Sequence, residues 1–247
     1  MGKLRVGLLA TLVLILLLMI MAPARLLQSV LPGDQILLQG LSGTLWRGHA
    51  GRALVAAGSG YLHLGALDWR LSPFSLLLFA PELDLQSSWG GQSLSSVVRY
   101  GGSEELDLYD LDALLPAALV REFVPLELSG SFSIQAEQLS LRQGLPYRGS
   151  GRLVWQNGAW VSPQGRRALG TYALDFEQAP GEPLIGRVIT LGGDLLAEGQ
   201  ISLEGRNVEV DVLLSGPGLS DPQLQQALQL VAVPEGDNFR VTLQSAL

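Results

Sequence analysis

The residues best suited to chemistry in this chain are two histidines and one dense group of carboxylates. His49 and His63 are far apart in the sequence, and the chain contains no cysteine. A zinc site needs three or four ligands from Cys, His or carboxylate groups, so this pair predicts ordinary strand or loop histidines. The absence of cysteine also excludes disulfides, thiol nucleophiles and thiolate metal sites.

The carboxylates gather in one segment, where a calcium site is the chemical alternative to weigh. Clustered carboxylates suit hard cations, but a calcium loop needs a glycine and a distal glutamate in fixed order. Asp110-Leu111-Asp112-Ala113 lacks that pattern. We therefore expect a solvated acidic segment that leads into a helix, whose positive end favours acids. The group consists of Glu104, Glu105, Asp107, Asp110 and Asp112.

The sequence motifs of common enzyme classes are missing. There is no Gly-x-Ser-x-Gly elbow for acyl transfer, no phosphate-binding loop and no Gly-x-Gly-x-x-Gly after a strand. Lys3 is the only lysine. We therefore predict that the chain is not an enzyme and has no catalytic residues, cofactor or metal. An exported hydrolase that uses a pair of carboxylates remains the third alternative.

Charge is divided unevenly along the chain. The formal net charge is -7, from 16 basic and 23 acidic residues. The first 25 residues contain Lys3, Arg5 and Arg25 but no acid, so the rest of the chain is more acidic than the total suggests. A body this acidic excludes a basic nucleic-acid surface.

The N-terminal segment 6–22 predicts a membrane anchor. It is an uncharged, strongly apolar run, close to the short end of a transmembrane helix. Lys3 and Arg5 precede it, so residues 1–5 should be cytoplasmic and the body should lie across the membrane. A cleaved signal peptide is the alternative, since Ala22-Pro23-Ala24 resembles a small-x-small cleavage site. The apolar run is longer than a usual signal peptide core, which favours the anchor.

From residue 26 to 247 the pattern predicts one mainly β domain, which is large enough to bury a core. Apolar residues recur with a period of two between glycine turns, as in a curved antiparallel sheet, a sandwich or a barrel. The clearest alternations are Leu83–Leu85, Leu126–Ala136, Val208–Leu214 and Phe239–Leu243.

Two hairpins and two short helices are expected within this domain. Asn157-Gly158 predicts a two-residue hairpin turn with Trp155 opposite Trp160, and Glu204-Gly205-Arg206 predicts another turn. A helix should begin at Asp221-Pro222, where a capping residue precedes proline, and end before Pro234. Leucines at helical spacing predict the second helix over 110–123.

Short tryptophan-containing segments of the domain are similar to one another in sequence. Gly43-Thr44-Leu45-Trp46-Arg47-Gly48 is similar to the segment from Gly151 to Gly158. The segments 35–105 and 126–247 could therefore be related halves.

Several of these segments together resemble one protein family. Leu41-Ser42-Gly43-Thr44-Leu45-Trp46-Arg47-Gly48-His49-Ala50 resembles a block near the start of the type II secretion system protein N family. Leu67-Asp68-Trp69-Arg70-Leu71-Ser72-Pro73 is similar to the next block, and 149–159 and 169–172 follow in order. The resemblance covers nearly the whole chain.

This resemblance implies a protein of the inner membrane of a Gram-negative bacterium, with a periplasmic β-rich domain. The implied function is a non-enzymatic part of the type II secretion system, which exports folded proteins across the outer membrane, in contact with other subunits of that system. The family has no known catalytic residues, so the resemblance implies none in this chain. Its matched positions are expected to define the fold or contact partners: Gly43, Thr44, Trp46, Gly48, Trp69, Pro73, Trp155 and Gly158.

An alternative function follows from the first block, which is also similar to the wider AsmA-like group. That likeness implies a sheet that forms a lipid-holding groove. A β domain with only two short helices could leave an apolar face open, so a periplasmic lipid-binding or lipid-transfer module is the runner-up.

Overall fold

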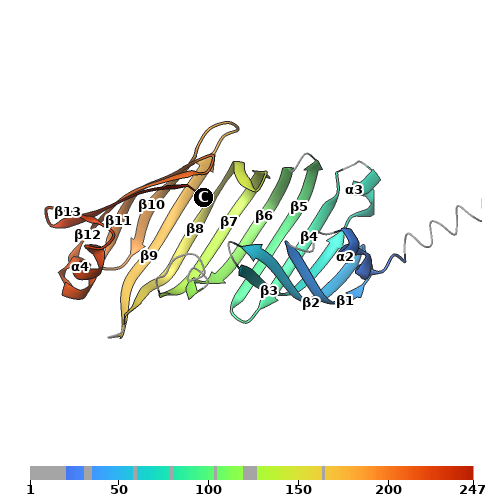
Figure 1. Ribbon diagram of the computed structural model, residues 1–247, viewed down its shortest axis with the longest axis horizontal. Helices are drawn as coiled ribbons and strands as arrows, with labels where there is room; N and C mark the ends of the chain where they lie inside the picture. Colours follow the sequence, from blue (N-terminus) through green and yellow to red (C-terminus); the bar gives the residue numbers. More distant parts are fainter. Residues whose placement is uncertain are drawn as a thin grey trace, which may run out of the picture. The chain divides into compact units, whose positions relative to one another are not determined.

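The computed structural model describes residues 21–30, 35–57, 60–77, 80–102, 105–118, 127–162 and 165–246. These residues are mainly β, and their strands pair antiparallel, as the sequence predicts (Figure 1). The chain divides into two compact units, Met1–Trp89 and Gly90–Leu247. The predicted anchor over 6–22 falls almost entirely outside the described residues. Among those that are described, no helix is long and apolar enough to cross a membrane.

Unit 1 contains four antiparallel strands that pair in the order of the sequence, β1-β2-β3-β4. Two short helical segments precede β1, and one short helix lies between β3 and β4. The elements are η1 (Ala24–Leu26), α2 (Leu27–Val30), β1 (Ile36–Gly43), β2 (Arg47–Ala57), β3 (Gly60–Leu71), α3 (Pro73–Leu77) and β4 (Glu82–Trp89).

The segment before β1 covers part of the apolar face of unit 1. Ala24 is only 2% exposed and packs in one core with Leu38 and Trp69. The Gln28 side chain donates a hydrogen bond to the Leu38 carbonyl at 3.0 Å, and Leu45 N–H donates to the carbonyl of Ala22 at 2.8 Å. The segment before β1 is therefore held against edge strand β1 by a hydrogen bond and by apolar packing.

Unit 2 contains ten antiparallel strands in the order β5-β6-β7-β8-β9-β10-β11-β12-β14-β13. Up to β12, each strand pairs with the one that follows it in the sequence, as expected for successive hairpins. The strands are β5 (Gln92–Gly102), β6 (Glu105–Pro116), β7 (Leu128–Arg142), β8 (Leu145–Ser162), β9 (Gly165–Gln178), β10 (Leu184–Gly192), β11 (Leu196–Glu204), β12 (Asn207–Ser215), β13 (Val233–Glu235) and β14 (Asn238–Ala246).

Alternation along the strands gives this sheet one apolar and one polar face. On the apolar face, Phe132, Trp155 and Tyr172 lie opposite one another on β7, β8 and β9. The ring of Phe176 lies over Gly151, where a Cβ would come within 2.6 Å of the ring. Large side chains on this face therefore pack over small residues of the neighbouring strands. The rings of Phe132, Trp155 and Tyr172 are half-buried.

The C-terminal part of the same face is covered by helical turns. The segments η3 (Pro217–Ser220) and α4 (Pro222–Leu228) follow β12 (Figure 1). Leu195, Leu219, Ala232 and Phe239 form a buried cluster there, with Leu224 and Leu228 of α4 packed against it.

The helix predicted after Asp221-Pro222 is confirmed as α4. Asp221 caps it, since its carboxylate accepts hydrogen bonds from the N–H groups of Gln223 at 2.9 Å and Leu224 at 3.5 Å. Proline in the first turn needs no hydrogen-bond partner, as expected at a helix start. The predicted β11–β12 hairpin is also confirmed, with Gly205 at a φ of 59° in its turn.

The helix predicted over 110–123 is wrong for its described part, because Asp110–Pro116 belongs to β6. Asp110 has a φ of 49° and is an extra residue of β6 relative to β5. The helix was predicted from the leucines that follow it, but Leu111 and Leu115 lie on one face of β6 and Leu114 lies on the other. A strand with apolar residues on both faces lacks the period of two and can show a helical spacing instead.

The hairpin turn predicted at Asn157-Gly158 is also wrong. Both residues lie inside the continuous strand β8, so Trp155 and Trp160 are on one strand instead of facing each other. Asn157 has a φ of 51°, and the register with β9 shifts between Trp155 and Gly158. The backbone conformation suited to Asn-Gly is used here for a bulge instead of a turn.

The two units meet in the sequence at Trp89 and Gly90. The relation proposed between segments 35–105 and 126–247 stays a prediction, as does the extent of a single domain over 26–247.

Candidate functional site

The family-like positions of unit 1 gather around one tryptophan. The Trp69 ring is 4% exposed and lies against Gly48, where an added Cβ would be 2.2 Å from ring atom Cζ2. Its indole N–H donates to the Leu45 carbonyl at 3.1 Å. Glycine is required at position 48 because the ring occupies the space of any side chain.

Gly43 and Thr44 form the turn between β1 and β2. Thr44 N–H donates to the Arg47 carbonyl at 2.9 Å, and Thr44 Oγ1 accepts from Arg47 N–H at 3.2 Å. Gly43, at a φ of 84°, has the Arg47 carbonyl 2.6 Å from the place of a Cβ. Gly43 and Gly48 pair with each other across this turn.

Trp46 and Pro73 complete the set in unit 1. The Trp46 carbonyl accepts a hydrogen bond from Leu71 N–H at 2.8 Å, which ties the turn to the end of β3. Pro73 is exposed and begins α3. The structure thus brings Gly43, Thr44, Trp46, Gly48 and Trp69 together at one end of the sheet, with Pro73 just beyond it.

A related contact occurs in unit 2. The Trp155 ring packs over Gly158 in the bulge of β8, with ring atoms 2.8 Å from the place of a Cβ. Its indole N–H donates to the Ser129 carbonyl at 3.1 Å. Phe132 and Tyr172 flank it, each with a ring centroid 5.8 Å away.

Tyr172 anchors this aromatic group to the turn between β10 and β11. Its hydroxyl lies 2.9 Å from both the Leu169 and Leu195 carbonyls and can donate its one proton to either. Burial raises the pKa of Tyr172 to about 12, because the ionised phenolate would lose its hydration there.

Glu104 lies outside the described residues, and the other acids considered for calcium are spread along β6. Glu105 pairs with Arg142, Asp107 accepts a hydrogen bond from Ser140 at 2.5 Å, and Asp112 accepts from Gln135 at 3.1 Å. Along the described ranges, no group of three or more His, Cys, Asp or Glu side chains could hold a metal ion.

The two histidines lie in unit 1 in different environments. His49 Nδ1 is 2.9 Å from Asp68 Oδ1 at the surface. The ring of His63 packs against Trp89, with centroids 4.2 Å apart. His49 lies on β2 and His63 on β3, which agrees with the prediction of strand or loop histidines.

The polar face of unit 2 carries a row of charged and amide side chains that crosses the strands. Register places one such residue of each successive strand opposite the next. The best-defined pair is Arg152–Asp175, with N···O distances of 2.5 and 2.7 Å. The row consists of Asp112, Gln135, Arg152, Asp175, Arg187, Gln200 and Asp211.

Arginines favour the ionised form of two acids of this row, Asp175 and Asp211. A hydrogen bond from Arg152 lowers the pKa of Asp175, and a hydrogen bond from Arg240 lowers the pKa of Asp211. Sequence reasoning missed this row, because it becomes visible only when the strand registers are known. A period of two relates residues within one strand only.

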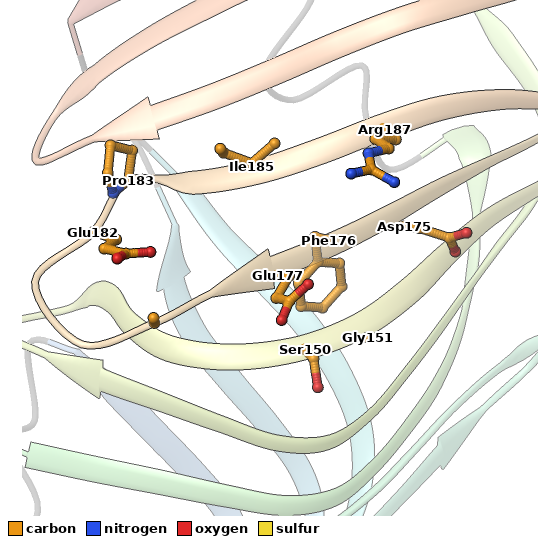
Figure 2. A pocket seen from close by; sticks show the side chains of 10 residues that line it. Ser150, Gly151, Asp175, Phe176, Glu177, Glu182, Pro183, Ile185 and Arg187 are labelled. Atoms are coloured by element: carbon orange, nitrogen blue, oxygen red, sulfur yellow. The ribbon is translucent and has the colours of Figure 1, made fainter.

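A pocket of about 470 Å³ opens on this row between β8, β9 and β10. Figure 2 shows Asp175, Glu177, Glu182 and Arg187 around it, with the ring of Phe176 nearby. Three carboxylates and one guanidinium suit hydrogen-bond donors or a basic side chain. The other described pockets are also lined largely by charged and amide residues, so the lipid alternative gains no support from them.

Comparison with known proteins gives the family. The family model described as type II secretion system (T2SS), protein N, matches residues 34–242. The chain belongs to the type II secretion system protein N family. A member of that family, "Type II secretion system protein N" of Aeromonas hydrophila, is 29% identical over 217 residues, which cover 83% of this chain and 82% of the relative. No solved structure gives a significant match.

Membership of the protein N family agrees with the resemblance found in the sequence blocks. The matched range begins just before β1 and ends within β14. It therefore includes the tryptophan and glycine contacts of both units. Whether Gly43, Thr44, Trp46, Gly48, Trp69, Pro73, Trp155 and Gly158 also touch a partner stays a prediction.

Proposed function

We propose that this chain is a non-enzymatic component of the type II secretion system at the inner membrane, supporting the export of folded proteins across the outer membrane. The observation that carries the proposal is the family match over residues 34–242. A secretion component is the reported identity of the Aeromonas hydrophila relative, and other subunits of that system are the proposed partners.

The proposed topology is a cytoplasmic segment 1–5, a membrane anchor over 6–22 and a periplasmic body. It rests on Lys3 and Arg5, which precede an uncharged apolar run, and on the positive-inside rule.

A non-enzymatic function is supported by the way the polar groups are used. The carboxylates of Asp175 and Asp211 accept hydrogen bonds from Arg152 and Arg240. Their low pKa values suit permanent ion pairs better than proton transfer near neutral pH. The buried Trp69 of unit 1 and the half-buried Trp155 and Tyr172 of unit 2 pack against neighbours and donate hydrogen bonds to backbone carbonyls.

Deletion and complementation in the bacterial host test the role in secretion. Loss of the gene should leave folded substrate enzymes in the periplasm, and the wild-type chain should restore their release into the medium. Crosslinking in intact cells should recover other secretion-system subunits. Normal secretion in the deletion strain, together with no such crosslink, would overturn the proposal.

The absence of cysteine makes a topology test simple. A single cysteine placed at exposed Gln229 should react with a membrane-impermeant maleimide in spheroplasts, whereas a cysteine placed at Gly2 should react only after lysis. The opposite pattern would exclude a periplasmic body. N-terminal sequencing of the mature chain separates an anchor from a cleaved signal, which would leave a new terminus near Ala24.

A further inference from the structure

The last long strand of unit 2 has an open edge. β14 pairs with β12 from Phe239 to Ala246 without a shift in register. On its other side, β13 pairs only with Asn238–Arg240. Within the described part of the chain, Val241–Ser245 therefore has a strand neighbour on one side only.

The hairpin between β13 and β14 shows which backbone groups face that edge. Gly236-Asp237 forms a two-residue turn, with Gly236 at a φ of 63°, so the flanking pair Glu235–Asn238 exchanges backbone hydrogen bonds. Pro234, which has no N–H, then falls opposite Phe239 at a non-bonded position, as proline must.

By the same alternation, every second residue after Asn238 points its N–H and C=O away from β12. These residues include Thr242 and Gln244. The β11–β12 hairpin gives the same result independently. Its two-residue turn at Gly205-Arg206 makes Glu204–Asn207 a hydrogen-bonded pair, so alternate residues of β12, including Val210, bond to β14 instead. Val210 pairs with Leu243, which leaves the backbone groups of Gln244 facing outward.

This edge has none of the usual protection against strand pairing. Proteins commonly block exposed edges with charged residues, proline or a bulge. The segment Val241-Thr242-Leu243-Gln244-Ser245 contains no charge, proline or glycine. In unit 1, by contrast, the Gln28 side chain donates to the Leu38 carbonyl of edge strand β1.

The side chains along the edge define the chemistry of an added strand. Leu243 is 55% exposed on the apolar face and would be covered by an apolar neighbour. On the polar face, Gln244 donates to Glu209 at 3.2 Å. Among the described residues, Glu209 forms no ion pair, whereas neighbouring Asp211 is paired with Arg240. A basic side chain beside Gln244 would complement this acid.

We propose that the β14 edge binds an extended segment of a partner protein through the backbone of Thr242 and Gln244, by strand addition. The segment alternates apolar and polar residues and carries Arg or Lys beside Gln244. This inference rests on the proposed function, because it supplies the contact that a secretion component needs.

A second copy of the chain fits the edge less well. Two-fold pairing of β14 with itself would place two Glu209 carboxylates on the same side, where like charges repel. β13 also limits the edge to about five residues, or roughly 17 Å at about 3.4 Å per residue. A strand pair this short buries too little surface for a stable dimer, which needs about 1,200 Å² or more.

The direct test uses the full chain in detergent and a synthetic peptide with blocked ends, Ser-Val-Arg-Val-Ser. Saturating peptide should slow hydrogen exchange of the Thr242 and Gln244 amides at least tenfold. The variant Gln244→Pro removes an edge-facing N–H and should weaken binding at least tenfold. Gln244→Ala keeps that N–H and serves as the matched control.

Charge is tested on the same system. A peptide with Glu in place of Arg should bind at least threefold more weakly to the wild type, and Glu209→Gln should remove that preference. Equal binding by the wild type and a folded Gln244→Pro variant would overturn the proposal. So would association of the chain with itself that Gln244→Pro abolishes, since the occupant would then be a second copy.

Complementation separates this inference from the proposed function. With melting temperatures matched to the wild type, Gln244→Pro should restore secretion less well than Gln244→Ala. If even the wild-type chain has no effect on secretion, the proposed function fails, and the peptide experiment still decides whether the edge binds strands.

Discussion

The two units use the same contact, a tryptophan ring on a glycine, in different backbone settings. In unit 1, Trp69 of β3 covers Gly48 of the neighbouring strand and is 4% exposed. In unit 2, Trp155 covers Gly158 of its own strand, at a bulge, and is half-buried. Each indole N–H donates to a backbone carbonyl at 3.1 Å.

The comparison shows that similar sequence segments can preserve a contact without preserving a turn. Gly43 and Gly48 close the β1–β2 hairpin, whereas Gly158 lies within continuous β8. The shared features are the space that glycine leaves for an indole ring and the backbone carbonyl that accepts a hydrogen bond from the indole N–H.

The largest difference is expected from removing the rings. Trp69→Ala should lower the free energy of unfolding by about 3–5 kcal/mol, because it leaves a cavity in a closed core. Trp155→Ala should cost roughly 2 kcal/mol, since its ring is already partly in contact with water. Denaturant unfolding followed by far-UV circular dichroism measures both, and equal losses would contradict the distinction drawn here.

Substitution of the glycine partners should also destabilise unit 1 more than unit 2. The losses in free energy of unfolding should be smaller than those from removing the rings. Gly48→Ala places a Cβ 2.2 Å from the Trp69 ring, and Gly158→Ala places one 2.8 Å from the Trp155 ring. We expect losses of about 1–3 kcal/mol, with Gly48→Ala nearer the upper value. Gly91→Ala, with no atom within 4 Å of the added Cβ, is the control and should be nearly neutral in the same unfolding experiment.

High pH should weaken the aromatic group of unit 2 selectively. The pKa of Tyr172 rises from 10.0 to about 12 in the folded chain, so its stabilising contribution is present below pH 10 and is lost as the pH rises towards 12. After allowance for solvent screening, the loss should be about 1 kcal/mol. Tyr172→Phe should remove this pH dependence, and an unchanged profile in that variant would assign it to another group.

The smallest effect is expected on the polar face. Arg152→Gln should raise the pKa of Asp175, because the hydrogen bond that lowers it is lost. The stabilisation is present above the unfolded pKa of Asp175 and is lost as the pH falls through its lower folded value. At this exposed position, we expect no more than about 0.5 kcal/mol. NMR titration of Asp175 checks the shift, with Arg148→Gln as a control outside the pair.

The sequence allowed the β class, several strands, the α4 helix and the family to be predicted, because period-two patterns, caps and motif order are local signals. The two errors have different causes. Asn157 adopts a positive φ value in a bulge of β8, although Asn-Gly predicted a turn. The helix over 110–123 was predicted from leucines that lie on both faces of β6. The Arg152–Asp175 pair and the open β14 edge depend on pairing between strands, which no local pattern records.

The strand order of unit 2 has a consequence for how the chain acquires its structure. From β5 to β12, each strand pairs with its successor in the sequence, so loop closure is short and the contact order is low, which favours fast folding. If the body crosses the membrane from its N-terminal side, each hairpin can form as soon as its second strand emerges. Without cysteine, assembly needs no oxidation step. β14 is made after the other described strands, and beyond β13 its outer edge has no strand neighbour among the described residues.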